Sequence, residues 1–189
     1  MSLVELIGQA DERGLAASGL ACLDRCLPLL GADDELLRPL WAGLAEDGYA
    51  GRWGELWEQV RSKAGDAGTG GDEEAVLLAR RMLAAAPAEP SAAEVRVWAD
   101  ACSVASLRIH RLLEVAAPRE ADASSVDARR EGRTEGMSPL VSAELRRQIV
   151  VLELLAEHGV GGLRRVLEVS TEGRRVLRAV VSRRARGRG

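Results

Sequence analysis

The chain has 189 residues, a mass of 20.2 kDa and a formal net charge of −3, with 47% hydrophobic and 29% charged residues. This composition excludes a chain that is disordered throughout, and the length allows one domain or two small ones. No apolar run approaches the roughly 18 residues that span a bilayer. Residues 1–5 have neither the basic start nor the apolar core of a secretory signal. We therefore expect a cytoplasmic protein without a membrane partner.

The scarcity of some residue types points to the genome rather than to chemistry. The sequence has no Phe or Asn, one Lys (Lys63) and one Tyr (Tyr49), whereas Ala, Arg and Gly are abundant. The scarce types have A/T-rich codons and the abundant ones G/C-rich codons. The composition is therefore similar to that of high-GC actinobacterial proteins. The excess of Arg over Lys is not by itself a sign of guanidinium chemistry.

Charge is uneven along the chain. Residues 1–100 have a balance of −9 and residues 101–189 a balance of +6. From Arg164 onward nine arginines stand against two glutamates, a local balance of +7. An acidic body with a basic C-terminal end bears on the partner rather than on the fold.

The first half of the chain predicts a series of helices, because its apolar residues recur at steps of three and four. Ser2 and Glu5 match a capping box at the start of the first helix. Pro28 is expected to kink or end the second helix early. In chain order we expect helices over about 15–30, 37–48, 53–60 and 72–86, with a glycine-rich connector at 65–71.

The clearest element is a long helix from Ser91 to Ala117. Ser91 and Glu94 match a second capping box, and the helix is expected to end before Pro118. A heptad-like stripe follows, made by Val95, Trp98, Cys102, Ala105, Ile109 and Leu112. Such a helix predicts either the spine of a bundle or one half of a dimer contact.

The C-terminal part begins with residues 118–137, which are rich in Arg, Glu, Asp, Ser and Gly and read as a mobile charged linker or loop. Ser138 and Pro139 are typical of a helix start. In chain order we expect helices over about 139–158, 163–169 and 171–181, and a frayed basic tail over 183–189.

Together these patterns predict an all-α protein, an irregular bundle of about eight or nine helices. Residues 1–117 form an acidic helical bundle with its long central helix around 91–117, and residues 138–189 form C-terminal helices that pack back on it. The side chains expected to be buried are Val95, Trp98, Cys102, Ile109, Val141, Leu145, Ile149 and Leu152.

Cysteine and histidine give no strong site. Cys22 and Cys26 lie one helical turn apart, which is not the spacing of a zinc knuckle. Buried core thiols are the better explanation of all three cysteines, Cys102 included. His110 and His158 have no partner that the sequence identifies, and the dipole of a helix C-terminus accounts for His158. We expect no catalytic residue, no metal and no cofactor.

The glycine-rich connector and two tryptophans each have a functional and a simpler structural explanation. The glycines of 65–71 lead into a helix as in a phosphate cradle, but Asp72, Glu73 and Glu74 would repel an anion there. Trp53 and Trp57 are expected to pack the core, with an interface or cleft as the alternative.

The Arg-rich C-terminal helix and tail could contact a polyanion. The candidate residues are Arg174, Arg175, Arg178, Arg183 and Arg184. A helix-turn-helix over 163–181 is a related alternative, while a solvated tail in an Arg-biased protein is the simpler explanation.

These observations favour a non-catalytic protein–protein interaction or adaptor module, whose partner is another protein or a second copy in a homodimer. The alternative is a nucleic-acid-associated accessory or regulatory protein that uses the Arg-rich C-terminal helix and tail. An enzyme ranks third, because the sequence shows no catalytic constellation.

Overall fold

The computed structural model describes residues 1–64, 73–114 and 123–187, and in these ranges all regular structure is helical, which confirms the all-α class. The connector at 65–71 and the start of the predicted linker, at 118–122, lie outside these ranges. In chain order the helices are α1 (Leu3–Gln9), α2 (Glu12–Leu30), α3 (Arg38–Ala45), α4 (Ala50–Ala64), α5 (Glu74–Ala84), α6 (Ala92–Leu113), α7 (Ala123–Arg130), α8 (Pro139–His158), the 3-10 helix η1 (Gly159–Gly162) and α9 (Leu163–Arg186).

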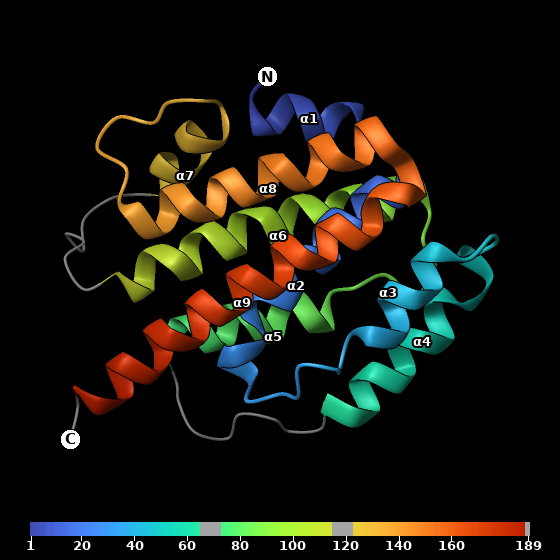
Figure 1. Ribbon diagram of the computed structural model, residues 1–189, viewed down its shortest axis with the longest axis horizontal. Helices are drawn as coiled ribbons and strands as arrows, with labels where there is room; N and C mark the ends of the chain where they lie inside the picture. The colour runs from blue at the N-terminus through green and yellow to red at the C-terminus, as the bar shows by residue number, and fades with distance from the viewer. Residues whose placement is uncertain (65–72, 115–122, 188–189) are drawn as a thin grey trace.

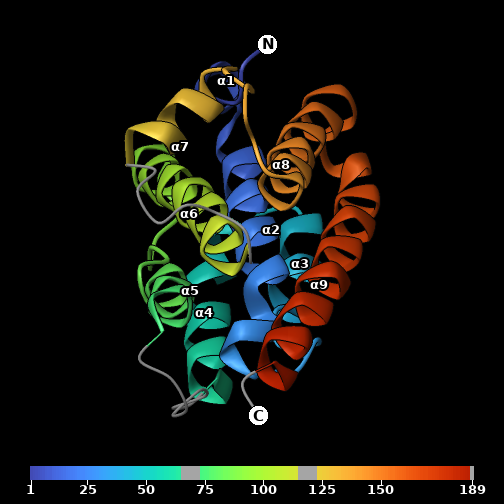
Figure 2. The ribbon, with the colours of Figure 1, turned by 90° about the vertical axis from the view of Figure 1, so that its left-hand side faces the viewer.

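Helix α2 is the centre of the bundle. It packs against α5, α6, α8 and α9, and Figure 2 shows it between α6 on one side and α9 on the other. Every residue from Gly14 to Leu27 is buried. A helix that is apolar around its whole circumference is stable in water only when neighbours cover all of its sides. Pro28 lies inside the helix and does not end it, since α2 continues to Leu30.

A cluster of aromatic rings joins α4 to this centre. Trp53, Trp57 and Trp98 meet edge to face, with ring centroids 5.5–6.2 Å apart. The Trp98 ring lies against Gly19 of α2, where a Cβ would come within 2.6 Å of it. Helices α2 and α6 therefore approach each other this closely only because residue 19 has no side chain.

Helix starts follow the expected chemistry. At Ser2 the full capping box forms, with Glu5 N–H donating to Ser2 Oγ at 3.3 Å and Ser2 N–H to Glu5 Oε2 at 2.7 Å. At Ser91 the Glu94 N–H donates to Ser91 Oγ at 3.3 Å, and the Ser91 hydroxyl donates to Glu94 Oε2 at 3.0 Å. Ser138 caps α8, whose bounds match the prediction.

The long helix and the predicted core are also close to expectation. Helix α6 runs from Ala92 to Leu113, and five residues of the predicted stripe, from Val95 to Ile109, face the interior, whereas the sixth, Leu112, is 37% exposed. Of the eight side chains predicted to be buried, Ile149 alone is half-buried and the others are buried. Most of the stripe is thus covered within a single chain.

Two elements differ from the sequence prediction. The C-terminal region is one helix, α9, which crosses the molecule without a break at residue 170 (Figure 1). The helix-turn-helix alternative was therefore wrong, because the structure has a continuous helix where that motif requires a turn. Within that helix the Thr171 hydroxyl donates to the Leu167 carbonyl at 2.9 Å, one turn earlier. The helix extends to Arg186, through most of the tail that was expected to fray.

The second difference is α7, which lies within the residues read as a linker or loop. Its apolar content is low, but Val126 and Arg130 are buried. Arg130 donates to Ser103 Oγ at 3.2 Å and also pairs with Asp100, so α7 is attached to α6 by polar contacts. A pattern search for apolar periodicity does not detect such a helix.

Candidate functional site

The basic half of α9, Gly173–Gly187, contains six arginines and no Asp or Glu. Some of these arginines point into the molecule and others point away from it. The inward ones fix α9 on the bundle, and the outward ones form the candidate site.

Arg174 points inward and is buried. Its Nη1 donates to the Asp24 carboxylate of α2 and, at 3.3 Å, to the Asp34 carbonyl oxygen. Asp24 also accepts the indole N–H of Trp41 at 2.9 Å. Burial raises the pKa of Asp24, and the charge of Arg174 and the Trp41 hydrogen bond oppose that rise. Arg174 thus has a structural partner and is not part of an open surface.

Arg178 and Arg184 attach the next turns of α9. Arg178 forms a two-pronged ion pair with Asp34, in which Nη1 lies 3.0 Å from Oδ2. The hydrogen bonds from Arg178 lower the pKa of that carboxyl. Arg184 Nη1 donates to the Leu112 carbonyl at 2.8 Å, at the C-terminal end of α6. Together with the contacts of Arg174, they fix α9 against α2, against the segment between α2 and α3 that contains Asp34, and against the end of α6.

The remaining side chains form the arginine face, which we define as Arg175, Arg183 and Arg186. All three are exposed, and within the described ranges they have no ion-pair or hydrogen-bond partner. Arg175 and Arg186 are about three turns and about 16 Å apart, so they lie on nearly the same side of the helix. Arg183 is displaced by less than a quarter turn. The last turns of α9 lie at the edge of the molecule (Figure 1).

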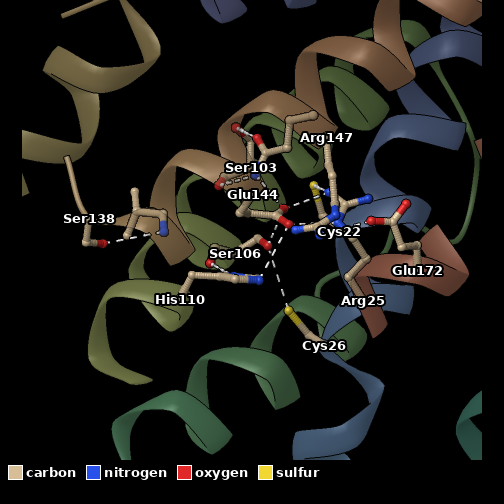
Figure 3. Close-up of polar contacts among 12 residues, drawn as sticks. Cys22, Arg25, Cys26, Ser103, Ser106, His110, Ser138, Glu144, Arg147 and Glu172 are labelled. Atoms are coloured by element: carbon tan, nitrogen blue, oxygen red, sulfur yellow. Dashed lines mark hydrogen bonds and ion pairs between the residues drawn. The ribbon is translucent and has the colours of Figure 1, made fainter. Parts of the chain in front are cut away.

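The other polar concentration is buried. Arg25 of α2 and Glu144 of α8 are both fully buried and form a bidentate ion pair with distances of 2.8 and 2.7 Å. Ser106 and Gln148 donate to the same carboxylate at 2.8 and 2.9 Å. Figure 3 shows Arg25, Glu144 and Ser106 converging between the helices. Burial would raise the pKa of Glu144, but the charges of Arg25 and His110 outweigh it and hold the value at about 2.

His110 borders this ion pair. Its Nδ1 lies 2.7 Å from the Ser106 carbonyl, which fixes Nδ1 as the protonated nitrogen of the neutral ring. Nε2 then faces Glu144 Oε2 at 3.5 Å (Figure 3). Burial lowers the pKa of His110 despite the nearby carboxylate. The imidazole is enclosed at 1% exposure and therefore has no route to a substrate.

The thiols are equally enclosed. Cys22, Cys26 and Cys102 are buried and unpaired. Burial raises the pKa of Cys22 to about 12 and raises that of the other two as well. A buried thiol that stays protonated is a poor nucleophile and a poor metal ligand. In the described ranges no three His, Cys, Asp or Glu side chains gather as a metal site would require.

The two tryptophans considered for an interface or cleft lie in the core. Trp53 is 1% exposed and Trp57 is 0% exposed, and Trp53 Nε1 donates to the Pro87 carbonyl at 2.9 Å. These two tryptophans therefore expose no surface that an interface could use. His158 is partly exposed at the end of α8, where its Nε2 lies 3.0 Å from Arg165 Nη1.

Sequence reasoning missed the buried ion pair, although a signal was present. Asp24 and Arg25 lie on a helix whose other buried residues are almost all apolar or small, and Glu144 with Gln148 lies on the inner side of α8. A charge at such a position predicts an oppositely charged partner elsewhere in the core.

Comparisons with protein-family models, with curated proteins and with solved structures found no match for this chain. None of the described helices is both long and apolar enough to cross a membrane. The function is therefore argued from the chain's own residues.

Proposed function

We propose that this protein is a non-catalytic binding module, an adaptor or accessory protein, that holds an acidic partner on the arginine face of α9. The observation that carries the proposal is the division of arginines on one helix. Three of them secure α9 to the bundle, and Arg175, Arg183 and Arg186 are exposed and have no hydrogen-bond or ion-pair partner among the residues that the structure describes. Guanidinium groups held at fixed spacing suit the recognition of anionic groups.

The buried groups support a non-catalytic role. The three thiols and the two histidines are the side chains most suited to nucleophilic or acid–base chemistry near neutral pH, and all but the partly exposed His158 are enclosed in the core. The buried carboxylate Glu144 already accepts bonds from three side chains. Its role is to join helices.

Self-association has less support. Most of the heptad-like stripe on α6 that favoured it is covered by α2, α5 and α8 within the chain, and of its six residues Leu112 alone is exposed. A second copy remains a prediction, to be tested by the mass of the untagged protein in native mass spectrometry.

The test compares two triple variants that remove the same charge. The variant R175Q/R183Q/R186Q removes the arginine face, and R38Q/R81Q/R146Q removes three other exposed arginines, on α3, α5 and α8. Binding of labelled heparin and poly-L-glutamate is measured by fluorescence anisotropy at low salt. We expect at least one probe to bind the unmodified protein and the control variant alike, and the arginine-face variant at least about tenfold more weakly.

Unfolding in urea checks that both variants keep their fold. Arg38 of the control variant forms an exposed ion pair with Glu35, and losing such a pair costs less than about 1 kcal/mol of unfolding free energy. Exposed substitutions elsewhere change it by no more than about 0.5 kcal/mol. The proposal is wrong if no polyanion binds, or if both variants weaken binding equally, since net charge alone would then explain the result.

A further inference from the structure

We infer that the acidic partner is the sugar–phosphate backbone of a double-stranded nucleic acid, bound without sequence preference; this rests on the proposed function of the arginine face. The first reason is what surrounds the three guanidinium groups. Between Gly173 and Gly187 no large hydrophobic residue is exposed. The uncharged positions exposed there are small, and they include Ala179 and Ser182.

Such a surface is poorly suited to a protein partner. Protein interfaces draw most of their binding energy from aromatic or large aliphatic anchors buried at their centre. The arginine face offers no such anchor, so an exposed carboxylate would gain little more than a surface ion pair there. A nucleic acid backbone is different, because each neutralised phosphate also releases condensed counterions, and charge alone supplies the affinity.

The second reason is the absence of a surface for stacking bases. The five aromatic residues of the chain are Trp41, Tyr49, Trp53, Trp57 and Trp98, and all are buried, at 8% exposure or less. Proteins that hold single strands stack bases on exposed aromatic rings. This chain has none to offer, so a duplex, whose phosphates lie on the outside and whose bases stay paired, is the better fit.

The third reason is where the charge lies. Residues 1–163 have a balance of −10 and residues 164–189 a balance of +7. A polyanion is repelled by the body and attracted by one end of it. The last turns of α9, which end at Arg186, lie at the edge of the molecule (Figure 1), whereas Arg175 lies halfway along the helix. The repulsion by the body has a range of about 8–10 Å at physiological salt. Contact is therefore confined to a short stretch of duplex along the second half of α9.

The contacts predict a specific salt dependence. Three arginines that each neutralise one phosphate give a slope of about −2.7 for log Kobs against log salt. Affinity then falls about 40-fold between about 50 and 200 mM salt. Arg178 is half-exposed and lies one turn from Arg175, but its pair with Asp34 keeps it from adding a full contact.

The experiment measures anisotropy of labelled duplex DNA, duplex RNA, a single strand of the same length and poly-L-glutamate, with the unmodified protein and both triple variants. We expect both duplexes to bind more tightly than the single strand and poly-L-glutamate. R175Q/R183Q/R186Q should weaken duplex binding at least about tenfold and flatten the salt slope, while R38Q/R81Q/R146Q should leave both within about twofold. Two duplexes of unrelated sequence should bind equally.

Three results would overturn the inference. Poly-L-glutamate binding as tightly as duplex, with the same loss in the arginine-face variant, would identify an acidic protein as the partner and leave the proposed function intact. A preferred single strand or a preferred duplex sequence would contradict backbone recognition. Duplex binding that the arginine-face variant does not weaken would remove the assigned surface.

Discussion

Arg25 and Arg175 carry the same guanidinium group in opposite settings. Arg25 is fully buried and both prongs of its fork are bonded to Glu144, whereas Arg175 is exposed and unpartnered. A buried ion pair adds little net stability when intact, but breaking it leaves an uncompensated charge in the core. An exposed arginine costs the fold almost nothing and is available to a ligand. The core of the bundle therefore uses arginine to hold helices together, and the outer side of α9 leaves it free to bind.

The sharpest test of this contrast is Glu144→Ala. It leaves Arg25 charged and unpaired in the core, so we expect a loss of about 3–5 kcal/mol in the free energy of unfolding, measured in urea. Glu58→Ala, which breaks an exposed pair with Arg61 on α4, should cost less than about 1 kcal/mol. The double variant R25M/E144L should recover much of the loss. Equal effects of Glu144→Ala and Glu58→Ala would refute the distinction.

A second test stays within α9. Arg174→Met removes the ion-pair partner of the buried Asp24 and should cost about 2–3 kcal/mol of unfolding free energy. Arg178→Met breaks only the half-exposed pair with Asp34 and should cost less than about 1 kcal/mol. Thermal or urea unfolding of both variants under one set of conditions measures the two losses. A larger loss in Arg178→Met than in Arg174→Met would contradict the inward position of Arg174.

The third test uses the space beside Arg25. A Cβ at Gly173 would meet Arg25 Cγ at 3.0 Å and Arg147 Cδ at 3.1 Å, so Gly173→Ala should destabilise by about 1–3 kcal/mol. Gly51 of α4 has nothing within 4 Å of a Cβ, and Gly51→Ala should leave stability unchanged or raise it. If both substitutions stabilise the protein, α9 does not pack on Arg25 as described.

The smallest effect is a dependence on pH. Burial lowers the pKa of His110 in the folded chain below its ordinary 6.5, so the unfolded chain binds the extra proton first. Stability contributed by the neutral ring is complete above pH 6.5 and declines as the pH falls below it. The lowered pKa of Glu144 adds a further loss below its ordinary 4.5, toward about 2. In His110→Gln the decline between pH 6.5 and 5 should be shallower, as urea midpoints at several pH values would show.

The sequence predicted those parts of the fold that are encoded locally. Ser138 and Pro139 start α8, and the stripe beginning at Val95 marks the inner side of α6. The break expected near residue 170 of α9 was wrong, and Gly173 does not interrupt the helix either. Its actual role is to let α9 lie directly on Arg25. That contact belongs to the tertiary structure and leaves no local pattern.

The candidate site was predictable only as a set of arginines. The sequence could not divide Arg174 from Arg175, since the two are adjacent and identical in type. What separates them is the 100° turn between successive helical residues and the position of Asp24 on α2. The pair Arg25–Glu144 was missed for the same reason, because periodicity reports which side is buried and not which distant side chain lies opposite.

The separation of Arg25 and Glu144 also affects how the chain is made. Helix α2 is among the first parts to be synthesised, but α8 and α9, which cover two of its sides, are among the last. At about 5–20 residues per second, its apolar surface and the unpaired Arg25 stay uncovered for about ten seconds or more. During that interval the nascent chain is a natural client for chaperones. A ribosome that stalls before α8 would release an acidic fragment with exposed apolar surface, which is a substrate for proteolysis.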